Sequence, residues 1–166
     1  MVKIISATTD EDFDVFRAMV REFSDWAFKT FHPEETTPPP AFADVEKELA
    51  HLPGKYADPD GAILLALVDD QVVGCIAGFR HDANTTEVSR LWVRSQGRGH
   101  GVGTALVERF VHLSQSNGYK RIVLRSHRAM TSAHRIYQEA GFEIMDGRGE
   151  FPSIRDNALA MQKDIA

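Results

Sequence analysis

The chain has 166 residues, of which 43% are hydrophobic and 26% charged, and its formal net charge is −5. This length fits one domain over residues 1–166, and the near-average composition argues against disordered, collagen-like and membrane proteins. The excess of acidic over basic residues argues against non-specific nucleic-acid binding, because neutralising phosphates needs a basic surface.

The amino terminus lacks the charged-then-apolar layout of a signal peptide, and no apolar run approaches the ~18 residues that span a bilayer. We therefore expect a cytoplasmic protein with no membrane partner. The single cysteine, Cys75, cannot form an internal disulfide, and its apolar neighbours indicate a buried thiol. The oligomeric state stays open, with a homodimer as one option.

The first third of the chain predicts a short strand and two helices. After an apolar opening over residues 2–5, residues 8–31 carry apolar side chains at helical intervals behind threonine and aspartate caps. The proline-rich residues 32–40 interrupt this helix, because proline cannot continue it. Residues 41–52 then favour a second, shorter helix.

Strands dominate the rest of the prediction. The apolar runs 62–68 and 72–79 flank a polar turn, and residues 87–93 are rich in β-branched and aromatic side chains. A glycine-rich stretch leads into a helix that stops at Asn117 and Gly118.

A strand over 120–126, a helix from Met130 to Ala140 and two closing strands, 142–146 and 157–163, complete the predicted order. This order predicts an α/β (α+β) fold, in which a mixed sheet carries helices on both faces.

Glycine occupies every second position from Gly97 to Gly103, just where a helix begins. Glycine lets the backbone approach a ligand closely, and the first N–H groups of a helix have no partner within it. The helix dipole adds partial positive charge there, so the pattern predicts a phosphate-binding turn. The alternative is a tight connection with close helix packing, for which one glycine would suffice.

The spacing of this turn excludes two common phosphate sites. No Gly-Lys-Ser/Thr occurs, as a mononucleotide P-loop requires. A dinucleotide fingerprint fails because Val102 or Thr104 holds its last glycine position, and Arg125 and Ser126 stand where an acidic residue would bind ribose. The spacing that fits is [RQ]-x-x-G-x-[GA], over residues 98–103.

With this motif the sequence resembles the GNAT superfamily of N-acetyltransferases, in which the motif binds the pyrophosphate of acetyl-CoA. The resemblance includes the flanking strands and residues 133–144, which are similar to the family signature A-x-x-x-Y-x-x-x-G-F. It covers most of the chain from about residue 52 onward, and the two motifs in this order are specific.

The resemblance implies one GNAT domain with a mostly antiparallel sheet of about six to seven strands. In this fold the central strands, here 87–93 and 121–126, splay apart and hold the pantetheine arm of acetyl-CoA, the implied co-substrate. The implied cofactor-binding residues are Leu91, Trp92, Val93, Arg98, Gly99, His100, Gly101, Val102, Gly103, Thr104, Ser126, Ser132, Ala133 and Tyr137.

Two positions depart from the family pattern. Ser95 stands where a proline is usual, and Met130 stands where many members carry an asparagine that touches the cofactor. Ser126, Thr131 and Ser132 are the candidates to replace that asparagine.

The resemblance also implies two catalytic residues. Tyr137 stands at the proton-donor position, and a phenol of pKa about 10 can protonate a departing thiolate at neutral pH. The alternative is a core aromatic. Glu87 is the candidate base, and strand alternation predicts that Glu87, Ser89 and Leu91 share one face. The alternative for Glu87 is a solvated charge.

His127 and His134 are further titratable candidates, although the helical pattern predicts His134 on the polar side of its helix. The histidines show no metal-ligand spacing, so no metal is expected. By resemblance, the acceptor enters beside Phe23, Trp26, residues 32–40 and the loop 149–157, whose Arg155 is a candidate carboxylate ligand.

The sequence therefore predicts an acetyl-CoA-dependent N-acetyltransferase that acts on a small-molecule or amino-acid-like amine by direct attack in a ternary complex. The alternative is a non-catalytic acyl-CoA-binding or sensing module on the same fold, because a fold and a cofactor site do not establish turnover.

Overall fold

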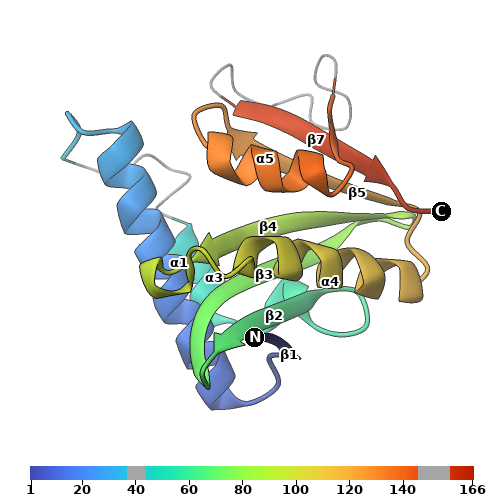
Figure 1. The fold of residues 1–166 in the computed structure, drawn as a ribbon, viewed down its shortest axis with the longest axis horizontal. Coiled ribbons are helices and arrows are strands. Elements are labelled where there is room, and N and C mark those ends of the chain that lie inside the picture. The colour runs from blue at the N-terminus through green and yellow to red at the C-terminus, as the bar shows by residue number, and fades with distance from the viewer. Residues whose placement is uncertain (37–43, 146–157) are drawn as a thin grey trace.

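The computed structural model describes residues 1–36, 44–145 and 158–166, and within these ranges seven strands form one sheet (Figure 1). The strands are β1 (Val2–Ser6), β2 (Ala62–Val68), β3 (Gln71–Asp82), β4 (Thr85–Val93), β5 (Arg121–His127), β6 (Glu143–Ile144) and β7 (Ala158–Asp164). The helices are α1 (Asp10–Phe31), α3 (Val45–Ala50), α4 (Val102–Ser116) and α5 (Thr131–Glu139), with 3₁₀ turns at Gly54–Tyr56 and Ser95–Gly97.

The strand order in the sheet is β1-β2-β3-β4-β5-β7-β6, and only the central β4–β5 pair is parallel. The predicted α/β class with a mostly antiparallel sheet is therefore confirmed. Among the described helices, none is long and apolar enough to cross a membrane.

Local sequence explains why α1 begins where it does. The Thr9 side chain accepts a hydrogen bond from the Asp12 backbone N–H (3.1 Å), and the Asp12 carboxylate accepts one from the Thr9 N–H (3.2 Å). This capping box satisfies backbone donors that the first helical turn leaves unpaired. The apolar side chains of α1 then recur at helical spacing, which buries Phe16, Met19 and Val20 against the sheet.

Helices cover both faces of the sheet, as predicted. On one face, Leu106 and Phe110 of α4 pack with Leu64 of β2 and Tyr137 of α5. On the other face, residues of α1 and α3 pack with Ile63 and Leu65 of β2. Strand β2 is buried on both sides because successive side chains point to opposite faces.

The ladder between β4 and β5 is short. It joins Thr85–Val88 to Arg121–Leu124, and within the described chain no further residue of β4 pairs with β5. Beyond Leu124, β5 stays paired with β7 on its other side, whereas β4 and β5 diverge toward their carboxyl ends (Figure 1). The sheet is therefore split at its centre, as the resemblance implied.

A bulge in β4 changes which side chains face each way. Ser89 pairs with Ala77 and Trp92 with Cys75, so two residues of β4, Arg90 and Leu91, stand opposite a single residue of β3. Arg90 takes a left-handed conformation with φ 58°.

The bulge overturns the prediction that Glu87, Ser89 and Leu91 share one face. Leu91 packs with the α4–α5 core, whereas Trp92 packs with the α1–α3 core. Glu87 lies on the α1–α3 side, because its direct cross-strand partner Phe79 packs there. Strand alternation fails here since the extra residue reverses the pattern beyond it.

We expect Gly78→Ala to destabilise the fold by about 1–3 kcal/mol, because a Cβ at Gly78 of β3 would collide with the Phe110 ring of α4. Urea unfolding measures this change. The cost should shrink when Phe110→Leu is present in the same chain, since the smaller side chain yields space. An equal cost in both backgrounds would contradict close packing of α4 on β3.

Candidate active site

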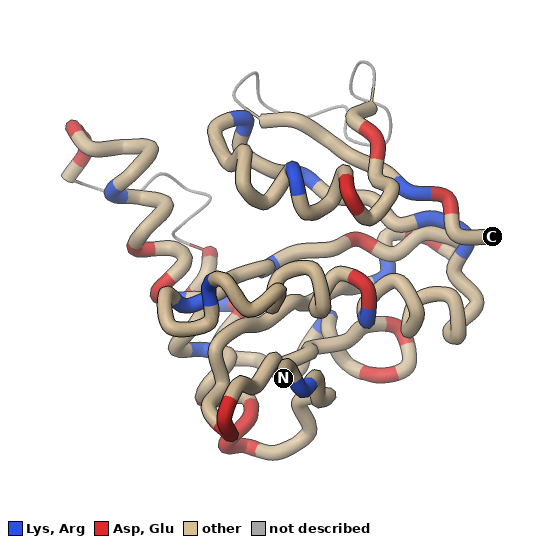
Figure 2. Tube along the Cα trace, viewed as in Figure 1, with Lys and Arg blue, Asp and Glu red and all other residues tan. Residues whose placement is uncertain are grey.

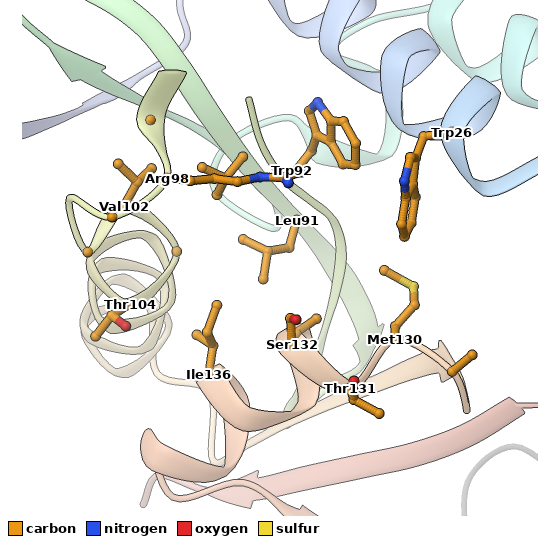
Figure 3. A pocket seen from close by; sticks show the side chains of 17 residues that line it. Trp26, Leu91, Trp92, Arg98, Val102, Thr104, Met130, Thr131, Ser132 and Ile136 are labelled. Carbon is orange, nitrogen blue, oxygen red and sulfur yellow. The ribbon is translucent and has the colours of Figure 1, made fainter. Parts of the chain in front are cut away.

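A cavity of about 470 Å³ lies between the start of α4, the start of α5 and the diverging half of β4. Its lining is Trp26, Leu91, Trp92, Val93, Gly97, Arg98, Gly99, Gly101, Val102, Gly103, Thr104, Ala129, Met130, Thr131, Ser132, Ala133 and Ile136. Figure 3 shows Arg98 and Val102 at one end, Trp26 and Met130 at the other, and Leu91 between them. The cavity thus connects the glycine-rich turn to the place where β4 leaves β5.

The four glycines of the turn have two different roles. Gly99 and Gly101 have φ values of 83° and 71°, and a Cβ on either would meet nothing within 4 Å. Gly97 and Gly103 lie where a Cβ would approach Val73 at 2.8 Å and Ile136 at 2.7 Å. Glycine is thus needed for backbone shape at two positions and for close packing at the other two.

The amino-terminal end of α4 meets this open space. Gly101 is the N-cap and has no side chain that could cap the first turn, and that turn carries no acidic residue. Its first N–H groups have no partner within the helix, and the helix dipole places partial positive charge there. This geometry suits a phosphate group.

The second binding element is the edge of β4. Leu91, Trp92 and Val93 line the cavity, and in the described ranges β5 offers no ladder partner to β4 beyond Val88. Backbone N–H and C=O groups along this edge need another partner. An extended, amide-containing ligand can supply one by lying along the strand.

The start of α5 forms the opposite wall. Thr131, Ser132 and Ala133 line the cavity, as does Met130, which stands where the family often has asparagine. Of the three proposed replacements for that asparagine, Thr131 and Ser132 therefore reach the cavity. Ser126 does not line it, and the Ser126 Oγ lies 2.9 Å from Nε2 of His134.

His134 is buried, with 7% of its surface exposed, so its predicted position on the polar side of α5 is wrong. The ring points inward because Ser126 of β5 supplies a hydrogen-bond partner there. Burial lowers the pKa of His134, which favours the neutral ring.

Tyr137 lies in the core beneath α5, with 5% of its surface exposed, and does not line the cavity. Its ring packs against Phe142 with centroids 5.3 Å apart. Burial raises the pKa of the Tyr137 phenol, and its hydroxyl makes no hydrogen bond to any residue in the described part of the chain. His100 also does not line the cavity, and its side chain is exposed.

Glu87 is buried on the α1–α3 side of the sheet and is not among the residues that line the cavity. Its carboxylate accepts a hydrogen bond from Nη2 of Arg125 (3.0 Å) and lies 3.3 Å from Nδ1 of His81. Glu87 and Tyr137 thus lie on opposite faces of the sheet, at the point where β4 and β5 part.

Trp26 of α1 lines the far end of the cavity, and the Phe23 and Phe31 rings pack against it. Trp26 is 39% exposed, lines the cavity and lies 5.6 Å from Trp92 between ring centroids. Phe31 stacks on His127 of β5 with centroids 4.0 Å apart, and burial lowers the pKa of His127. The carboxyl-terminal part of α1 therefore contacts both separated strands. The candidate carboxylate ligand Arg155 lies in residues 146–157, outside the described residues.

An ion pair that the sequence did not reveal fixes α1 against β4. Glu22 accepts hydrogen bonds from Nη2 (2.8 Å) and Nε (3.0 Å) of Arg94, and Nε1 of Trp92 donates to it at 3.4 Å. Hydrogen bonds from Arg94 hold the pKa of Glu22 below its usual value. Because Trp26 lies one turn beyond Glu22 on α1, this pair also positions the aromatic wall.

In the residues that the structure describes, no group of three or more histidine, cysteine, aspartate or glutamate side chains could hold a metal ion. Acidic and basic residues are interspersed over the trace in the view of Figure 2. The cavity itself is lined by apolar side chains, glycine backbone, the hydroxyl side chains of Thr104, Thr131 and Ser132, and Arg98. It therefore suits a ligand that combines an anionic end with a long, weakly polar arm.

Comparison with known proteins identifies the family. The profile of the Acetyltransferase (GNAT) family matches residues 17–142. The chain belongs to this family. The match contains the glycine turn, the split strands and α5, so the cavity lies within the family domain.

Two curated proteins are similar to this chain in sequence. An uncharacterized N-acetyltransferase of Schizosaccharomyces pombe is 29% identical over 147 residues, covering 87% of this chain and 85% of the relative. N-acetylaspartate synthetase of Danio rerio is 34% identical over 97 residues, covering 57% of this chain. That match spans only 34% of the synthetase's own length.

Solved GNAT structures share the fold. The PaiA N-acetyltransferase of Thermoplasma acidophilum, in complex with coenzyme A, has a TM-score of 0.76 at 18% identity and covers 99% of both chains. A GNAT acetyltransferase of Staphylococcus aureus has a TM-score of 0.75 at 19% identity and covers 100% of both. These identities are low, so the likeness concerns the fold alone.

Gly101→Val should weaken acetyl-CoA binding at least about tenfold, because the new side chain occupies the open space before α4 and removes one charge-assisted hydrogen bond or more. Calorimetric titration measures the affinity. The matched control is Gly118→Val at the other end of α4, where φ is 85° and the space is also open. Equal binding by both variants would exclude the turn as the anion site.

Proposed function

We propose that the chain is an acetyl-CoA-dependent N-acetyltransferase, which acetylates the amine of a small, amino-acid-like acceptor by direct attack in a ternary complex. The observation that carries this proposal is the continuous cavity from the glycine turn to the edge of β4 that has no ladder partner among the described residues. Family membership supports the same chemistry.

The residues present fit acetyl-CoA. The N–H groups at the start of α4 and the turn around Gly99 and Gly101 would hold the pyrophosphate. The backbone of residues 91–93 would bond the pantetheine amides, and Thr131 and Ser132 offer hydroxyl groups opposite them. Bound in this way, the co-substrate supplies an activated acetyl thioester where β4 and β5 diverge.

The reaction needs two proton movements. A neutral amine attacks the thioester carbonyl carbon, the carbon–sulfur bond breaks, and the thiolate accepts a proton while the amine loses one. Tyr137 is the proposed donor, because burial keeps its phenol protonated and its hydroxyl has no hydrogen-bond partner in the described chain. Glu87 is the proposed route for the amine proton, through water, from the opposite face.

An acceptor with a carboxylate is supported by the residues at the end of β5. Arg125 lies on the same face as Glu87, to whose carboxylate its Nη2 donates at 3.0 Å, and 53% of the Arg125 side chain is exposed. Guanidinium groups pair well with carboxylates. The name of the similar Danio rerio protein, N-acetylaspartate synthetase, points to the same class of acceptor.

One observation favours a second candidate, a non-catalytic acyl-CoA-binding module. Tyr137 is absent from the cavity lining in the described residues, so its hydroxyl would have to move to reach a thioester sulfur in the cavity. Binding of acetyl-CoA without turnover would match this second function.

Release of free thiol from acetyl-CoA in the presence of pooled amino acids and other amines distinguishes the two functions. We expect thiol release that depends on the acceptor, and faster release with dicarboxylic amino acids than with their side-chain amides. Tight acetyl-CoA binding with no thiol release from any pool would instead support the binding module.

Tyr137→Phe should lower kcat by about 10²–10⁴, the usual contribution of a positioned general acid, and leave acetyl-CoA affinity nearly unchanged. Because burial raises the pKa of the phenol, kcat of the wild type should show no fall from Tyr137 ionisation up to about pH 10.

Tyr119→Phe is the matched control, because Tyr119 is also buried and its hydroxyl donates to the Asp60 carbonyl (2.7 Å) outside the cavity lining. We expect kcat of this variant to stay near the wild-type value. A Tyr137→Phe enzyme within about threefold of wild type, well short of the general-acid range, would remove Tyr137 from the mechanism.

A further inference from the structure

Arg90 carries unusual backbone strain. In the described chain, three residues other than glycine have a positive φ: Asp69, Asp70 and Arg90. The two aspartates form the turn between β2 and β3, where such values are common. Arg90 instead lies inside β4, and a left-handed conformation is costly there for a residue with a Cβ atom, because the Cβ comes close to a backbone carbonyl oxygen. Something must therefore hold it there.

The conformation of Arg90 determines which side chains of β4 line the cavity. Because Arg90 is part of the bulge, Leu91 and Val93 turn toward the α4–α5 face, where they line the cavity. A regular strand would place Leu91 on the other face. The edge that would bond an acyl-CoA arm thus depends on the left-handed residue before it.

Contacts from the α1–α3 side hold Arg90 in place. Nε and Nη2 of Arg90 donate to the two carboxylate oxygens of Glu48 in α3, at 3.0 and 3.2 Å. The thiol of Cys75 donates to the Arg90 carbonyl at 3.2 Å. Only 22% of the Arg90 side chain and 15% of the Glu48 side chain are exposed, so this two-point pair is well shielded from solvent.

Glu48 is held independently of Arg90. Nζ of Lys55 lies 3.2 Å from its carboxylate. Burial would raise the pKa of Glu48, but the hydrogen bonds and charge of Arg90, with Lys55, outweigh it and lower that pKa. The carboxylate is therefore ionised at neutral pH and can orient the guanidinium.

Docking of α3 does not depend on this pair alone. Arg21 of α1 bonds both carboxylate oxygens of Glu46, at 3.1 and 2.8 Å, and Nε of Arg17 donates to the Leu49 carbonyl at 2.8 Å. These contacts already join α3 to α1. The Glu48–Arg90 pair is the link from α3 to the bulge of β4.

We propose that Glu48 is a positioning residue for acyl-CoA binding, which acts by holding Arg90 in the left-handed conformation that turns Leu91 and Val93 into the cavity. The proposal rests on the proposed function for its ligand. In this role, neither Glu48 nor Arg90 contacts the acyl group or the acceptor.

The first test compares Glu48→Gln with Glu46→Gln, two isosteric changes on the same short helix. Acetyl-CoA affinity is measured by calorimetry and folding by thermal unfolding. We expect Glu48→Gln to weaken binding about five- to thirtyfold, the factor that the cost of a left-handed residue implies, and Glu46→Gln to leave it unchanged. Equal affinities for Glu48→Gln and wild type would overturn the proposal.

The second test separates the backbone of Arg90 from its side chain. Arg90→Gly and Arg90→Ala both remove the guanidinium and leave Glu48 paired with Lys55, but only glycine adopts a positive φ without strain. We expect the glycine variant to bind acetyl-CoA about five- to thirtyfold more tightly than the alanine variant. A merely structural ion pair predicts the same affinity for both, which would overturn the proposal.

Acetyl-CoA binding by the wild type and by the two Arg90 variants separates the proposed function from the role of Glu48. If the wild type does not bind acetyl-CoA, the proposed function is wrong. If the wild type binds and the glycine and alanine variants of Arg90 bind alike, the proposed function stands and the role of Glu48 is wrong. Should Glu48→Gln not fold, the comparison of the two Arg90 variants still decides the question.

Discussion

The early end of the hydrogen-bond ladder between β4 and β5 is the constraint on which the candidate site depends. A strand in the middle of a sheet normally satisfies its backbone groups on both sides, and an unpaired buried group is costly. Here β5 leaves β4 after Val88, while on its other side it stays paired with β7 along its whole length. The sheet keeps its hydrophobic cores on both faces, yet its centre presents a polar backbone edge to a cavity.

Contacts from both sides stabilise this arrangement. Glu22 of α1 binds Arg94 just beyond β4, and Glu48 of α3 binds Arg90 within it, so two ion pairs fix the diverging half of the strand. On the other face, Gly103 allows α4 to pack closely on Ile136 of α5. The cavity walls are thus held by elements that are far apart in the sequence.

Local sequence patterns were sufficient for most of the fold. The apolar run 62–68 coincides with β2, and threonine capping predicted the start of α1, because hydrophobic periodicity and capping depend on neighbours along the chain. The glycine spacing likewise predicted the turn around Gly99 and Gly101, since only glycine adopts such φ values without strain.

What the sequence could not reveal depends on partners distant in the chain. Nothing near Arg90 signals a bulge, because Glu48 and Cys75, which contact it, are 42 and 15 residues away. The helical pattern predicted that His134 faces solvent, because it contains no information about Ser126 of β5. That residue lies beneath the helix and is a hydrogen-bond partner for the His134 ring. Tertiary contacts therefore decided these two positions.

The measurement that tests the central claim most directly is backbone hydrogen exchange with and without acetyl-CoA. Amides within Ser89–Val93 and Arg98–Thr104 should exchange markedly more slowly when acetyl-CoA is bound, while those of Thr85–Val88, already paired with β5, change little. Tight binding that leaves both of the first two segments unprotected would contradict the account, because the ligand would then lie elsewhere.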